Sequence, residues 1–171
     1  MENKKLKVAI VMGSDSDLSK LKGCISLLKD FGIEYEVMIC SAHRTPDAAA
    51  EFSRNAEKEG FGVIIAAAGK AAHLPGVIAA YTALPVIGVP LKGSALDGLD
   101  ALLSIVQMPS GVPVATVAID GGENAALLAV QILATSDEKL REKMKEYKKA
   151  LAKKVEEKNS KLQEILEKEG L

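Results

Sequence analysis

Short apolar runs rich in β-branched residues alternate along this chain with stretches whose apolar residues recur at helical spacing. The run from Leu6 to Met12 ends at Gly13, as is typical of a strand that is buried on both faces. Apolar residues then recur every three or four positions from Leu18 to Leu28, which predicts a helix. The same order of strand, loop and helix repeats until about residue 134.

Each repeat of this order adds one strand and one helix. The predicted strands cover residues 6–12, 33–40, 61–68, 84–89 and 112–119. The predicted helices cover residues 18–32, 47–59, 76–82, 96–106 and 124–134, and the last of these is predicted to be buried nearly all round. Strands that alternate with helices form parallel sheets with helices on both faces. We therefore predict an α/β fold with three layers, a flavodoxin-like doubly wound parallel sheet of about five strands.

A long charged helix is predicted after this core, over about residues 137–168. Its apolar stripe is thin and includes Leu140, Met144, Leu151 and Val155. Such a helix usually packs on a neighbouring surface, here that of another subunit, and exposes its charged face. No repeat or linker indicates a second domain, so we expect a single domain over residues 1–171, with its core at about 6–134.

Composition narrows the classes of partner. The chain has 171 residues, of which 48% are apolar and 26% charged, as in ordinary soluble globular proteins. A formal net charge of -1 gives no support to a nucleic-acid partner or to an anionic membrane surface. Cys24 and Cys40 lack metal-binding spacing and are predicted to be reduced thiols. Residues 1–7 lack the apolar core of a signal peptide and no run reaches membrane-spanning length, so we expect a cytoplasmic protein without a membrane partner.

Candidate chemistry follows three predicted strands, at the sheet edge where parallel sheets bind ligands. After the first strand, Ser14 and Asp17 either cap the next helix or face an anion and a sugar hydroxyl. After the second strand, the loop from Ser41 to Pro46 places His43, which can carry protons, beside Arg44, which can bind phosphate.

The third loop runs from Ala67 to Gly76 and consists mostly of small residues, which let a ligand approach the backbone. It contains His73, for which capping of the following helix and direct catalysis are both open. Two histidines without nearby carboxylates do not make a metal site. The segments from Pro90 to Ala95 and from Ser104 to Pro113 are by themselves predicted to be structural.

Six motifs in this order carry a resemblance to a known family. They are GSDSD, SAHRTPD, AAHLPG, LPVIGVP, SIVQMPSGVPVATVAI and NAALLAVQILA. Together they resemble the class I N5-carboxyaminoimidazole ribonucleotide mutases, also called the catalytic subunit of phosphoribosylaminoimidazole carboxylase. The similarity extends from about Lys7 to Ala134. It implies a single flavodoxin-like catalytic domain that moves a carboxyl group within a phosphorylated imidazole ribonucleotide during purine synthesis.

The resemblance also implies site residues and an assembly. His43 would be the general acid and base, Ser14 and Arg44 would bind the 5′-phosphate, and Asp17 would bind the ribose. The remaining implied substrate-binding positions are Ser41, Gly69, Ala71, Ala72, His73 and Leu74. The resemblance implies no metal or organic cofactor, and a homo-octamer with active sites at subunit junctions, shaped by residues 107–113.

Lys70 departs from the family pattern, which has a second glycine at this position. Its side chain either points outward or towards a neighbouring subunit, or it places its ammonium near the substrate's carboxylate or phosphate. Two other functions stay open beside the mutase. One is an aminoimidazole ribonucleotide carboxylase that uses free carbon dioxide, and the other is a non-catalytic flavodoxin-like nucleotide-binding module.

Overall fold

The computed structural model describes residues 6–93 and 95–171. Five strands alternate with helices, as predicted. The strands are β1 (Lys7–Met12), β2 (Tyr35–Ile39), β3 (Phe61–Gly69), β4 (Val86–Leu91) and β5 (Ala115–Thr116). The helices are η1 (Asp15–Asp17), α1 (Leu18–Phe31), α2 (Pro46–Asn55), α3 (Leu74–Tyr81), α4 (Leu99–Val106), α5 (Gly122–Leu133) and α6 (Glu138–Glu169).

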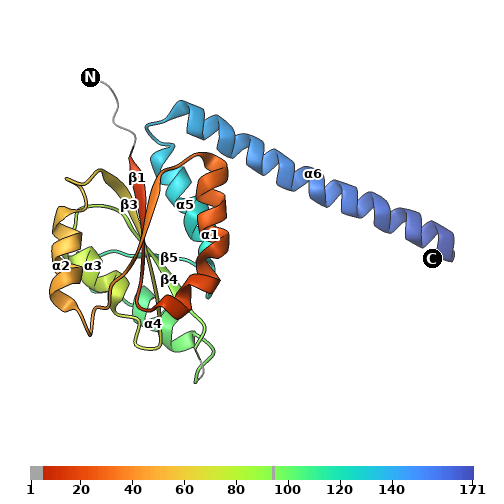
Figure 1. The fold of residues 1–171 in the computed structure, drawn as a ribbon. Coiled ribbons are helices and arrows are strands. Elements are labelled where there is room, and N and C mark those ends of the chain that lie inside the picture. The colour runs from red at the N-terminus through yellow and green to blue at the C-terminus, as the bar shows by residue number, and fades with distance from the viewer. Residues whose placement is uncertain (1–5, 94) are drawn as a thin grey trace. The chain divides into compact units, whose positions relative to one another are not determined.

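All five strands pair in parallel, in the order β2-β1-β3-β4-β5. Helices α1 and α5 pack together on one face, and α2, α3 and α4 cover the other (Figure 1). The expected three-layer, flavodoxin-like α/β fold is therefore confirmed. The chain leaves β1 in one direction to form β2 and then crosses to the other side to form β3. This reversal makes β1 and β3 the switch point beside which such sheets bind ligands.

The central strands form the core because helices cover both of their faces. Every residue of β4 is buried, and so are all but the first residue of β1 and the last of β3. Gly88 allows β4 to lie close to α4, because a Cβ at this position would overlap the side chain of Ile105. Cys24 and Cys40 are both free and buried.

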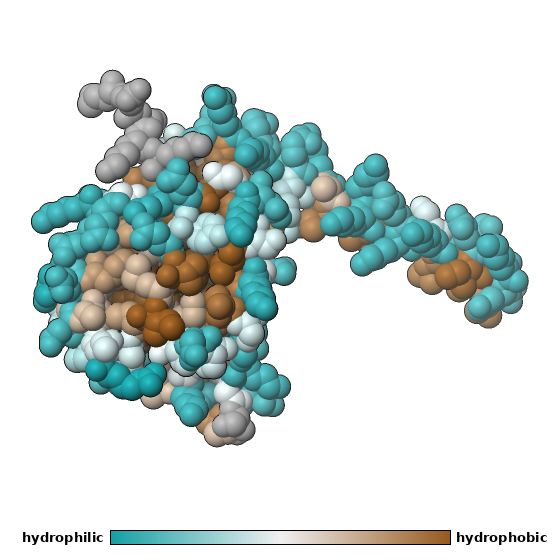
Figure 2. All heavy atoms as spheres, viewed as in Figure 1, coloured by the Kyte–Doolittle hydropathy of each residue, from teal (hydrophilic) through white to brown (hydrophobic). Residues whose placement is uncertain are grey.

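Two predicted elements differ from the structure beyond their end residues. The fifth strand has only two residues, since Pro113 lacks an N–H and a turn from Pro109 to Val112 precedes it. Helix α5 is buried along one face rather than all round, because α1 and the sheet cover one side only. Strand β2 lies at the sheet edge, where Val37 and Ile39 are exposed. Figure 2 shows apolar side chains on this face between α2 and α1.

The described chain divides into two compact units, with the boundary between Leu133 and Ala134. The second unit consists mainly of α6, which begins after Asp137, whose side chain accepts a hydrogen bond from the Leu140 N–H. The helix ends at Gly170 in the left-handed conformation that glycine adopts easily. Residues 1–5 of the expected single domain lie outside the described residues. No helix within the described ranges is long and apolar enough to cross a membrane.

Candidate functional site

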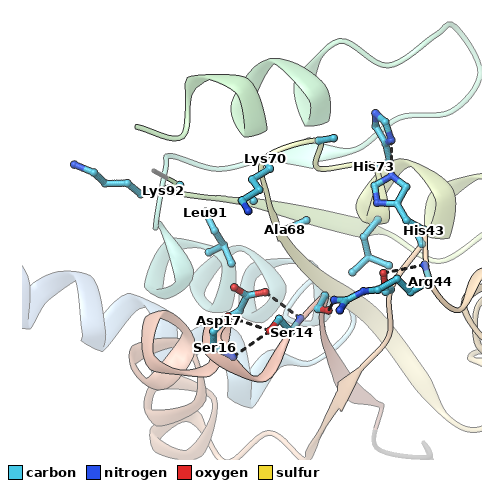
Figure 3. Close-up of a pocket in the computed structure, with 17 residues that line it drawn as sticks. Ser14, Ser16, Asp17, His43, Arg44, Ala68, Lys70, His73, Leu91 and Lys92 are labelled. Carbon is cyan, nitrogen blue, oxygen red and sulfur yellow. Dashed lines mark hydrogen bonds between the residues drawn. The ribbon is translucent and has the colours of Figure 1, made fainter. Parts of the chain in front are cut away.

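One cavity of about 620 Å³ lies at the carboxyl ends of β1, β2, β3 and β4. The loops that follow these strands supply its walls (Figure 3). The lining residues are Gly13, Ser14, Ser16, Asp17, Ser41, Ala42, His43, Arg44, Ala68, Gly69, Lys70, Ala71, His73, Leu74, Leu91, Lys92 and Gly93. Every site residue expected from the sequence is among them except Ala72, which is buried beside the lining and is 1% exposed.

The first loop is held by its own side chains. The Ser14 Oγ accepts a hydrogen bond from the Ser16 N–H at 3.4 Å, and an Asp17 carboxylate oxygen accepts one from the Ser14 N–H at 3.2 Å. These reciprocal bonds form a capping box, so the helix-capping role is present. Both side chains also line the cavity, so capping does not remove them from a ligand. Burial raises the pKa of the Asp17 carboxyl, and the bond from the Ser14 N–H opposes that rise.

The second loop is fixed in place and joined to the first. The Ser41 Oγ accepts a hydrogen bond from the Arg44 N–H at 3.2 Å, and the Thr45 hydroxyl donates to the Ser41 carbonyl at 3.0 Å. The Arg44 Nη2 donates to the Gly13 carbonyl at 3.0 Å, which brings the guanidinium to the first loop. Ser41 therefore orders the loop, and Arg44 stands beside Ser14 where an anion can contact both.

The two histidines of the chain meet in the cavity. The His43 Nε2 lies 2.8 Å from the His73 Nδ1, and the rings meet edge to face with centroids 5.0 Å apart. Two N–H groups cannot point at each other at this distance, so the contact holds one proton between the two nitrogens. His73 stands at the N-terminal cap of α3 but makes no side-chain capping bond. Its ring contacts the His43 ring instead. Of the two roles that the sequence left open for His73, the structure therefore does not show capping by the side chain and places the ring beside His43.

Lys70 lines the cavity and has a φ of 56°. The left-handed conformation costs an L-residue about 1–2 kcal/mol, and glycine adopts it freely. The backbone at residue 70 therefore has a conformation that glycine adopts without strain, although this chain has a lysine there. A second lysine, Lys92, also lines the cavity, but its ammonium lies 3.3 Å from the Asp97 carboxylate.

Sequence reasoning missed the contribution of β4. Leu91, Lys92 and Gly93 line the cavity, although the segment from Pro90 to Ala95 looked structural. The signal was available, because this segment also follows the carboxyl end of a parallel strand. Ser94, in the same segment, lies outside the described residues.

A comparison with protein families matches residues 7–154 to the model described as AIR carboxylase. The chain belongs to this family. An N5-carboxyaminoimidazole ribonucleotide mutase of Pyrococcus horikoshii is 57% identical over 165 residues, covering 96% of this chain and 93% of the relative. A phosphoribosylaminoimidazole carboxylase of Schizosaccharomyces pombe is 55% identical over 158 residues, which are 92% of this chain and 29% of that protein.

A solved structure agrees with the AIR carboxylase assignment. The crystal structure of Treponema denticola PurE has a TM-score of 0.81 and 34% sequence identity to this chain. The match covers 91% of this chain and 97% of that one. The shared fold therefore includes the strands whose ends line the cavity.

Proposed function

We propose that the chain is an N5-carboxyaminoimidazole ribonucleotide mutase of purine biosynthesis. It moves the carboxyl group from the exocyclic nitrogen of its substrate to ring carbon C4, giving 4-carboxy-5-aminoimidazole ribonucleotide. The observation that carries this proposal is the His43–His73 pair, which shares one cavity with Arg44 and Ser14. The name of the 57% identical Pyrococcus relative supports the same reaction.

The substrate is held by the first two loops. Arg44 and Ser14 bind the 5′-phosphate, because a guanidinium and a hydroxyl with nearby backbone N–H groups suit a phosphate. Asp17 accepts hydrogen bonds from the ribose hydroxyls. Ser41 orders the Arg44 backbone through its 3.2 Å hydrogen bond. The imidazole then lies toward the lining residues of the third loop, Gly69, Ala71 and Leu74.

His43 performs the proton transfers. As the carbamate C–N bond breaks, protonated His43 delivers a proton to the nitrogen, and carbon dioxide and aminoimidazole ribonucleotide form. The electron-rich C4 attacks the carbon dioxide and forms the new C–C bond. Neutral His43 then removes the C4 proton and restores the aromatic ring. His73 is the hydrogen-bond partner that orients the His43 ring through these steps. No step of this route uses a metal or an organic cofactor.

Carbon dioxide must stay beside C4 between the two steps. Gly69 and Ala71 line the cavity and are small enough to leave room for the gas against the backbone. The bound ribonucleotide then covers the cavity mouth. Proximity and exclusion of water then favour recapture over escape.

The proposed assembly is a homo-octamer in the cytoplasm, with sites at subunit junctions. Exposed apolar side chains on α4 support an interface between copies. They recur at helical spacing and comprise Leu99, Leu103 and Val106, with Leu96 just before the helix. Large exposed apolar groups of this kind mark association surfaces. Sedimentation of the active protein should give a large assembly, and a fully active monomer would contradict the shared site.

The test of function compares N5-carboxyaminoimidazole ribonucleotide and aminoimidazole ribonucleotide as substrates. We expect purified protein to convert N5-carboxyaminoimidazole ribonucleotide without added bicarbonate. His43→Ala and His43→Asn should fold normally and lose turnover by at least about 100-fold. Circular dichroism and thermal melting provide the folding control. A near-normal rate in either variant would remove His43 from its role.

An aminoimidazole ribonucleotide carboxylase is the second candidate function. It is supported by the Schizosaccharomyces relative, which is 55% identical to this chain and is named as a carboxylase. Turnover of aminoimidazole ribonucleotide that depends on bicarbonate, with no mutase activity, would favour that reaction.

A further inference from the structure

The cations of the cavity differ in whether they already have an anionic partner. Arg44, Lys70 and Lys92 are the lining residues with positive side chains, and Asp17 is the lining carboxylate. Lys92 is paired with Asp97. The Lys70 ammonium has no hydrogen bond or ion pair within residues 6–93 and 95–171. Figure 3 shows Lys70 and Arg44 reaching the same cavity from different loops.

The position of Lys70 is set by the backbone on both sides of the cavity. It follows Gly69 at the end of β3, and its Cγ would lie 3.7 Å from a Cβ placed on Gly93 in the loop after β4. Its stem therefore runs between the loops of β3 and β4. Its φ of 56° is a conformation that favours glycine. A residue held in a strained backbone conformation at a binding cavity indicates a use for its side chain.

The charge of the proposed substrate exceeds what Arg44 can neutralise. A phosphate monoester and a carboxyl group carry about three negative charges near neutral pH. Arg44 and protonated His43 supply one positive charge each, and Asp17 adds a negative one to the same cavity. Within the described ranges, Lys70 is the other lining cation that has no ion pair.

From this geometry we infer that Lys70 binds an anionic group of the substrate and determines specificity for it. This inference rests on the proposed function. The shared chemistry is an ion pair between an ammonium and an oxyanion, which either the 5′-phosphate or the carboxyl group supplies. A glycine at residue 70 would relieve the backbone but leave the cavity without this charge.

The test measures binding of three ligands by calorimetry. They are 4-carboxy-5-aminoimidazole ribonucleotide, 5-aminoimidazole ribonucleotide without the carboxyl group, and the carboxylated nucleoside without the phosphate. Lys70→Met should raise the Kd of the first ligand at least about tenfold, as loss of a charge-assisted hydrogen bond does. The effect should disappear for the ligand that lacks the group held by Lys70, which identifies that group.

Three further variants separate binding from folding. Lys70→Arg keeps the charge and should bind within a few-fold of the wild type. Lys70→Gly relieves the backbone strain and removes the charge, so its melting temperature should be no lower than that of the wild type. It should bind the ligands as weakly as Lys70→Met. Lys22→Met makes the same charge change on the exposed face of α1, away from the cavity, and should bind all three ligands within twofold.

The outcomes distinguish this inference from the proposed function. Equal Kd values for the wild type, Lys70→Met and Lys70→Gly on all three ligands would overturn the role of Lys70 while mutase turnover stands. Binding without turnover in the wild type would overturn the proposed reaction, and the Kd values would still decide the ion pair. A wild type that binds none of the ligands would overturn both.

Discussion

Replacing His73 tests whether His43 works alone or needs the partner that the structure gives it. The contact between the His43 Nε2 and the His73 Nδ1 is 2.8 Å, a full hydrogen bond. It is the one hydrogen bond that the described residues make to the His43 ring. His73→Ala removes it and leaves His43 free to rotate in the cavity.

The expected loss follows from the strength of one such bond. When His43 is neutral, this hydrogen bond contributes about 0.5–1.5 kcal/mol net, and when His43 is protonated it contributes more. Each 1.36 kcal/mol is a factor of ten in rate, so the neutral form sets a lower limit of about a 2- to 12-fold fall in kcat in His73→Ala. KM should stay nearly constant if His73 orients His43 rather than the bound ribonucleotide. His43→Ala removes the proton carrier itself, so its loss should be much larger.

Asparagine at residue 73 provides the matched control. Its amide is separated from Cβ by the same number of bonds as the imidazole Nδ1, so it can still reach the His43 ring. We expect His73→Asn to recover most of the kcat lost in His73→Ala, measured at saturating substrate with thermal melting as the folding check. Equal kcat in wild type and His73→Ala would refute the positioning role. A loss in His73→Ala as large as that of His43→Ala would show instead that His73 transfers protons itself.

Three other measurements test separate features of the site and core. Burial raises the pKa of the Cys24 thiol to about 12, so a Cys40→Ser variant should react very slowly with a thiol reagent at pH 8 until it is unfolded, and rapid native labelling would contradict the buried position. Burial also raises the pKa of Asp17, so ionisation of this carboxyl costs folding free energy as the pH rises above its unfolded value of 3.8. Asp17→Asn should therefore be at least as stable as the wild type at pH 7, since its amide oxygen still accepts the hydrogen bond from the Ser14 N–H. The difference should vanish near pH 3, where the Asp17 carboxyl is protonated in both the folded and the unfolded protein. Lower stability of Asp17→Asn at pH 7 would refute this. Arg44→Ala should raise KM with little change in kcat, since phosphate binding is the same in the ground and transition states, and a fall in kcat at constant KM would place Arg44 at the reacting atoms.

Much of the fold could be predicted because its central strands leave a clear pattern. The strands β1, β3 and β4 are nearly continuous apolar runs, since helices cover both faces of each. The fifth strand was predicted over residues 112–119 but covers only Ala115–Thr116. An apolar run at a sheet edge need not be paired along its whole length. Hydrophobic periodicity reports burial and does not report which backbone groups find a partner.

The sequence predicted which loops form the site, but it did not predict which of their side chains contact each other. The rule that ligands bind at the carboxyl ends of parallel strands brought Ser14, His43 and His73 together. The hydrogen bond between the two histidines depends on the strand order, which places β2 and β3 on either side of β1. Local patterns do not determine that order. The lysine itself gives no local signal for the left-handed backbone at residue 70, and only the glycine that the resembled family has at this position indicated it.

Helix α6 gains little from burial within its own chain. Of its 32 residues only Leu140 and Met144 are buried, and Leu151, Val155, Leu162 and Ile165 are exposed. Without covered apolar surface, a helical segment in water is only marginally stable and frays. Amide hydrogens beyond residue 150 should therefore exchange rapidly in dilute protein and become protected as concentration increases, which makes their exchange rate a local reporter of self-association.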